Sequence, residues 1–104
     1  MILGYLRLFG VGFFIFKKGT DAVMETRVAL IGIILSKPEA VEQVNALLHQ
    51  YRDHIMGRMG LPYREKDISI ISVVVDAPAD VISAISGKLG MLDGVSSKAI
   101  YSKT

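Results

Sequence analysis

The polar residues best suited to hold a ligand lie between positions 58 and 66. This segment reads RMGLPYREK and joins two predicted strands. Arg58 lies on an otherwise small or apolar strand, and Tyr63 and Arg64 follow the rigid Pro62 at the tip. A guanidinium, a phenol and nearby backbone amides can hold a carboxylate or a phosphate. The segment predicts a site for a small anionic ligand at Arg58, Tyr63 and Arg64; the alternative is a charged hairpin tip that only solubilises a strand end.

Catalytic and metal-binding residues form no comparable constellation. The two histidines, His49 and His54, lie five residues apart near the end of a predicted helix, so they do not share a helix face. The chain has no cysteine and no Gly-x-Ser-x-Gly motif. Residues 87–90 read GKLG, which lacks the spacing of a phosphate-binding loop. We therefore expect a protein that is not an enzyme and that holds no metal or cofactor.

Composition and charge narrow the class of partner. The 104 residues are 51% hydrophobic and 21% charged, which is typical of one globular domain. The formal net charge is +2, and residues 1–23 carry all of it. Residues 24–104 hold nine basic and nine acidic side chains, which leaves no positive surplus to bind a phosphate backbone. We expect no direct nucleic-acid binding.

Residues 1–23 differ from the rest of the chain. Apolar and aromatic side chains dominate up to Phe16, interrupted by Arg7 and followed by Lys17 and Lys18. The uninterrupted run is too short to span a bilayer, and its charges come after the apolar run, unlike those of a secretory signal. The segment could be a membrane-surface anchor, an additional packed element, or translated upstream sequence ahead of Met24, which we favour. The domain is predicted at residues 24–104, without membrane contact and in the cytoplasm.

A duplicated strand and helix make up this domain. Residues 28–41 align without a gap on residues 68–81, and each copy has a β-rich apolar run, a capping residue, a proline and a helix. Ser36 and Asp76 are good N-cap residues, and Ser36 with Glu39 has the spacing of a capping box. The pattern predicts helices over 37–53 and 77–89. Shorter strands are predicted over 54–61 and 95–102.

The resulting β-α-β-β-α-β order predicts an α+β, ferredoxin-like sandwich. Four strands form an antiparallel sheet, and two helices cover one of its faces. The right-handed crossover rule places strand 28–35 beside strand 68–75 at the centre, and we expect these two neighbours to be parallel.

Both central strands are apolar on both faces. An antiparallel strand with one wet face should alternate apolar and polar residues, and these do not. Two helices can cover only one face, so we expect a second copy of the chain to cover the other, in a homodimer or a dimer of dimers. Small residues that leave this face wet are the alternative. The predicted oligomer interface comprises Ile31, Ile33, Ile71, Val73 and Val75. Which of the two alternate sets faces outward depends on the register, so the set with Ile70 and Val74 stays open.

The chain resembles a small bacterial family labelled regulators of the iron-only hydrogenase system. The similarity covers about residues 25–104 and rests on GRMGLPY at 57–63, ISII at 68–71, DAP at 76–78, and LG at 89–90 followed by GV at 94–95. It implies an ACT-like fold, similar to the C-terminal sensing domain of nickel-responsive repressors.

The chain departs from those repressors at their metal site. They carry several histidines and a cysteine, whereas residues 69–75 here hold no ligating side chain. Residues 1–23 are also too short and too aromatic for the ribbon-helix-helix segment with which those repressors read DNA. The resemblance therefore implies a regulatory module that binds a small ligand or a partner without catalysis. The alternative is an assembly partner of hydrogenase maturation proteins.

Overall fold

Six regular elements follow one another in the predicted β-α-β-β-α-β order. The computed structural model describes residues 25–103, so the predicted extension over 1–23 lies outside the described residues. The elements are β1 (Arg27–Leu35), α1 (Ala40–Gln50), β2 (Ile55–Tyr63), β3 (Ile68–Ala77), α2 (Ala79–Gly90) and β4 (Val95–Tyr101). Single 3₁₀ turns lie at Arg52–His54 and Arg64–Lys66. None of the helices in this part of the chain has the length and apolarity needed to cross a membrane.

The four strands form one sheet in the order β2-β3-β1-β4, with every neighbouring pair antiparallel. This confirms the ferredoxin-like fold. The expectation that the two central strands are parallel is wrong, because β1 pairs with β3 in antiparallel register. The crossover rule applies to the strands that a helix joins, namely β1 with β2 and β3 with β4. Since β3 returns from β2 through a hairpin and inserts beside β1, it runs against both.

The predicted helix caps are also wrong. The side-chain oxygen of Ser36 donates its proton to the carbonyl of Gly94, 3.3 Å away, and makes no bond to α1. Helix α1 starts only at Ala40, and neither helix has a side-chain cap bond. Asp76 lies within β3, because that strand continues to Ala77. Tertiary pairing of the strand ends therefore shortens both helices at their N-termini.

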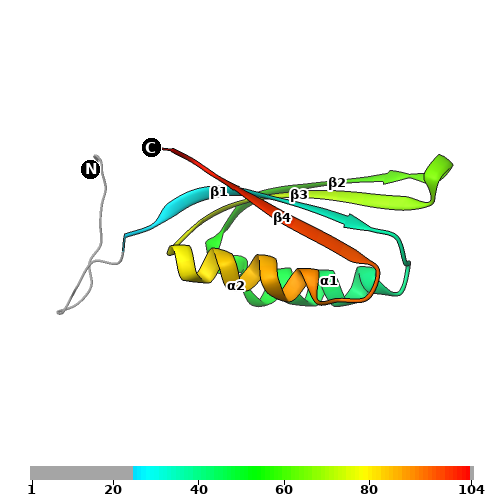
Figure 1. Ribbon diagram of the computed structural model, residues 1–104, viewed down its shortest axis with the longest axis horizontal. Helices are drawn as coiled ribbons and strands as arrows, with labels where there is room; N and C mark the ends of the chain where they lie inside the picture. Colours follow the sequence, from blue (N-terminus) through cyan, green and yellow to red (C-terminus); the bar gives the residue numbers. More distant parts are fainter. Residues whose placement is uncertain (1–24, 104) are drawn as a thin grey trace.

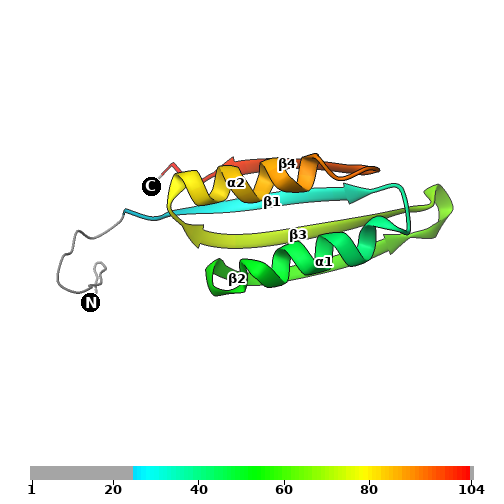
Figure 2. The ribbon, with the colours of Figure 1, turned by 90° about the horizontal axis from the view of Figure 1, so that it is seen from below.

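Both helices lie on one face of the sheet (Figure 1). Helix α2 runs along β4 and β1, and α1 runs along β3 and β2 (Figure 2). The core between the layers contains the alternate side chains of β1 and β3 together with three buried residues from each helix. The other face of the sheet carries no element of the described chain.

The residues predicted to form an oligomer interface belong to this core. Ile31, Ile33, Val73 and Val75 are fully buried, and Ile71 is 8% exposed. The choice of these five positions is therefore wrong, because they face the helices. The alternate set of each strand, which includes Leu30, Ile34 and Val74, lies on the helix-free face.

Candidate functional site

A shallow basic hollow lies between α1 and β2 on the helix side of the sheet. It has a volume of about 300 Å³ and is lined by Asn45, Leu48, His49, Arg52, Ile55 and Arg58. We call it the arginine hollow. Its polar lining comes from the outer face of α1, the turn that follows it and the middle of β2, while Leu48 and Ile55 form an apolar floor that joins the core.

Two hydrogen bonds hold the guanidinium groups of this hollow in place. Arg58 Nη2 donates to Oδ1 of Asn45 at 2.8 Å, which ties β2 to α1. Arg52 Nη1 donates to the backbone carbonyl of His49 at 3.0 Å, at the end of the helix. A guanidinium has five N–H donors, so each arginine retains donors for a ligand. None of the described residues that line the hollow carries a carboxylate.

A second hollow, which we call the loop hollow, lies where the β1–α1 loop meets the β2–β3 hairpin. It has a volume of about 200 Å³, and its lining includes Ser36, Lys37, Arg64, Asp67 and Ser69. Its positive charge is largely neutralised. Nζ of Lys37 lies 2.7 Å from Oδ2 of Asp93. The hydrogen bond and charge of Asp93 raise the pKa of Lys37 above its usual value. Asp67 adds a carboxylate to the lining itself.

The three predicted ligand residues do not form one site. Arg58 pairs with Val73, so it lies on the helix side of the sheet. Tyr63 pairs with Ile68, which places it on the opposite face. Arg64 lies on the 3₁₀ turn at the hairpin tip and lines the loop hollow. Because successive residues of a strand point to opposite faces and Arg58 and Tyr63 are five residues apart, these two side chains cannot converge on one ligand.

Sequence reasoning missed the partners of Arg58. Asn45, His49 and Arg52 follow one another at steps of four and three, which puts them on one face of a helix. That spacing was a usable signal for a polar helix face. Only the tertiary structure brings Arg58 of β2 against this face, because the contact depends on how α1 packs on the sheet.

The described residues contain no cluster of side chains that could bind a metal ion. Within residues 25–103, no three side chains of histidine, aspartate or glutamate come close enough together to hold an ion. His49 lies in the arginine hollow beside two guanidinium groups, a surrounding that opposes a cation. The chemistry available at this hollow is the non-covalent binding of a negatively charged group.

Comparison with known proteins identifies the family to which the chain belongs. The family described as "TM1266-like: Iron-only hydrogenase system regulator, putative" matches residues 27–99, which include five of the six elements completely. The chain belongs to this family. The solved structure of the uncharacterized protein TM1266 from Thermotoga maritima is 39% identical, with a TM-score of 0.73. The alignment covers 76% of this chain and 100% of that one. No curated protein matches the chain.

Membership of the TM1266-like family agrees with the resemblance drawn from the sequence motifs. The family's description names a regulator and no reaction. The description names no ligand or partner either.

Proposed function

We propose that this chain is a regulatory module of the iron-only hydrogenase system, and that it acts by binding a small anionic ligand in the arginine hollow, without catalysis. The observation that carries the proposal is the convergence of His49, Arg52 and Arg58 on one hollow whose described lining has no carboxylate. The regulatory role rests on the family's description.

The basic side chains favour a carboxylate or a phosphate as the ligand. Arginine binds both groups through paired N–H donors, and such charge-assisted bonds are stronger than neutral ones. Asn45 holds the Arg58 guanidinium in one orientation, which lowers the entropy cost of binding. The loop hollow is the weaker candidate, because Asp93 already pairs with Lys37 and the Asp67 carboxylate would repel an anion.

The size of the hollow limits the size of the ligand. Its volume of about 300 Å³ is at the lower end of the range of roughly 300–1,000 Å³ for small-molecule sites. The apolar floor of Leu48 and Ile55 leaves room for a short aliphatic portion beside the charged group. An amino acid, a small carboxylic acid or a phosphorylated metabolite fits this description.

A thermal-melting screen tests the proposal. The full chain is melted with inorganic phosphate, nucleoside monophosphates and each of the standard amino acids in turn. A ligand that binds only the native state at ten times its dissociation constant adds about 1.4 kcal/mol of stability. In a domain of this size that corresponds to a rise in melting temperature of roughly 6–11 °C.

Variants then locate the site. Arg58→Ala and Arg52→Ala should each remove most of the ligand-induced shift, while Arg64→Ala should retain it. Arg64 is the matched control, since it is an exposed arginine that lines the other hollow. Loss of the shift in Arg64→Ala alone would move the site to the loop hollow and refute the assignment. The absence of a shift with every anion in the screen would refute anion binding altogether.

A further inference from the structure

The helix-free face of the sheet is built from apolar rows that cross the strands. We call it the open face. Because directly paired residues of antiparallel strands share a face, the register defines these rows. One row is Val74, Leu30 and Ile100, and a second is Leu61, Ile70 and Ile34. Five of these six side chains are exposed, from Val74 at 36% to Ile100 at 68%.

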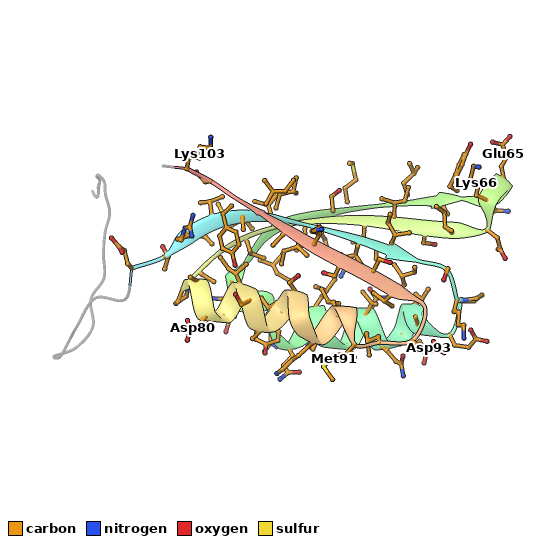
Figure 3. All side chains as sticks on the ribbon, in the orientation of Figure 1. Glu65, Lys66, Asp80, Met91, Asp93 and Lys103 are labelled. Carbon is orange, nitrogen blue, oxygen red and sulfur yellow. The ribbon has the colours of Figure 1, made fainter. Side chains whose placement is uncertain are left out.

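Charged groups lie at the margins of this face. Lys98 lies on the edge strand β4, and Asp76 lies near the end of β3. Glu65, Lys66 and Lys103 are at the extremities of the molecule on this side (Figure 3). Apart from Asp76, the central strands β1 and β3 carry no charged side chain on the open face, although Lys98 of β4 pairs with Gly32 at its middle. The two central strands therefore suit an apolar partner surface better than a nucleic acid or an acidic peptide.

The middle row of the open face is Met59, Ser72, Gly32 and Lys98, and the two small residues at its centre form a trough between the two apolar rows. Gly32 of β1 pairs with Ser72 of β3 at the middle of the sheet. A Cβ atom added at Gly32 would meet no atom within 4 Å, and its φ is not positive. The folded chain therefore does not itself require glycine at this position. Glycine within a central strand weakens it, and it often marks a place where another backbone or ligand approaches closely.

We infer that a second copy of this chain packs on the open face, sheet against sheet. The open face is self-complementary, because rows of branched side chains lie on either side of the trough. In the dimer, an apolar row of one copy packs against Gly32 and Ser72 of the other copy. A hollow of about 240 Å³ beside Leu30, Val74 and Ile100 adds a recess for a partner side chain.

The area of the open face suits a dimer. Four strands spaced about 4.8 Å apart and seven to ten residues long give a face of about 19 by 30 Å, or roughly 570 Å² in projection. Its accessible area is larger, because side chains corrugate it. With this corrugation the accessible area approaches about 800 Å², the area that each partner buries in a stable interface, and the projection alone lies at the upper end of the roughly 300–600 Å² range for the largest apolar patches of monomers.

Continuation of the sheet through the edge strand β2 is disfavoured. Edge strand β2 has a register shift between Ile55 and Gly57, and it carries Pro62, which has no N–H to donate. Bulges and prolines on edge strands oppose pairing with another chain. The second copy is therefore not expected to extend the sheet at β2.

Light scattering coupled to size-exclusion chromatography tests the dimer. The full chain at about 100 μM should have twice the mass of one chain. Leu30→Asp should run as a monomer with an unchanged circular-dichroism spectrum. Met91→Asp is the matched control, because Met91 is an 86% exposed apolar residue on the helix side of the molecule and should leave the dimer intact.

Gly32→Ala provides the variant that must still fold. In an isolated monomer the added methyl meets open space and restricts the unfolded chain, so the melting temperature measured at high dilution should rise. At a close interface the same methyl overpacks the contact, so dimer dissociation should become easier by at least roughly tenfold. A monomeric unmodified chain would overturn the inference. So would association that persists in Leu30→Asp, or Gly32→Ala dimers as tight as the unmodified ones. None of these outcomes depends on ligand binding in the arginine hollow.

Discussion

Replacement of Gly94 by alanine should destabilise the fold through a contact between segments far apart in sequence. Gly94 lies between α2 and β4 with φ at +79°, and a Cβ atom there would come within 2.7 Å of Cγ and 2.9 Å of Cβ of Lys37. The carbonyl of Gly94 also accepts the backbone N–H of Ser36 at 2.8 Å. Relief of the clash must therefore move the backbone of the turn against the β1–α1 loop.

The magnitude follows from two contributions. Left-handed backbone geometry costs a residue with a Cβ atom about 1–2 kcal/mol. Loss or lengthening of the Ser36–Gly94 hydrogen bond costs about 1 kcal/mol more. We expect the free energy of unfolding to fall by about 2–3 kcal/mol, which lowers the melting temperature by roughly 10–20 °C in a domain of this size.

Matched variants separate the causes. Gly87→Ala lies within α2, where an added Cβ meets nothing within 4 Å, so it should raise stability by about 0.5–1 kcal/mol. Gly94→Asn should recover part of the backbone cost, since asparagine tolerates left-handed geometry, yet it should stay below wild type because its Cβ meets Lys37. Urea denaturation measures all three. If Gly94→Ala were as stable as the unmodified chain, the clash and the strain would both be refuted.

Two further predictions concern metal and the start of the chain. Stoichiometric nickel or zinc should leave the melting temperature unchanged, because residues 25–103 gather no three ligating side chains; a rise of several degrees that His49→Ala and His54→Ala abolish would contradict this. A chain that begins at Met24 should be soluble and folded, because the six elements of the described residues form a complete β-α-β-β-α-β unit within residues 27–101; a disordered circular-dichroism spectrum would refute it.

The sequence predicted the number, order and type of the regular elements because the signals for them are local. Apolar runs, prolines and helical spacing recur in the two halves of the chain, and each predicted element exists in the structure. Element ends were less predictable. Ser36 has the chemistry of a cap, yet its N–H and hydroxyl bond to Gly94, 58 residues away. A local pattern cannot show that a distant turn competes for the same side chain.

The arginine hollow was half predictable. Arg58 stood out because it interrupts an apolar strand, and the helix spacing of Asn45, His49 and Arg52 could have been read from the sequence. What brings these residues together is the packing of α1 against the sheet, which places Arg58 2.8 Å from Asn45. The same packing places Tyr63 on the opposite face and removes it from the predicted set.

The sequence by itself determined that both faces of the central strands are rich in apolar residues, and it predicted that one face has a cover beyond the two helices. The sequence did not determine which of the two faces the helices cover. Both alternate sets of β1 and β3 contain several branched apolar residues, and a shift of one residue exchanges the two sets. In the tertiary structure, Ile31 and Val73 lie in the core, whereas Leu30 and Val74 lie on the surface. The reason is geometric, since the apolar stripes of both helices meet the sheet on one side only, and the antiparallel register of β1 and β3 fixes which side chains point there.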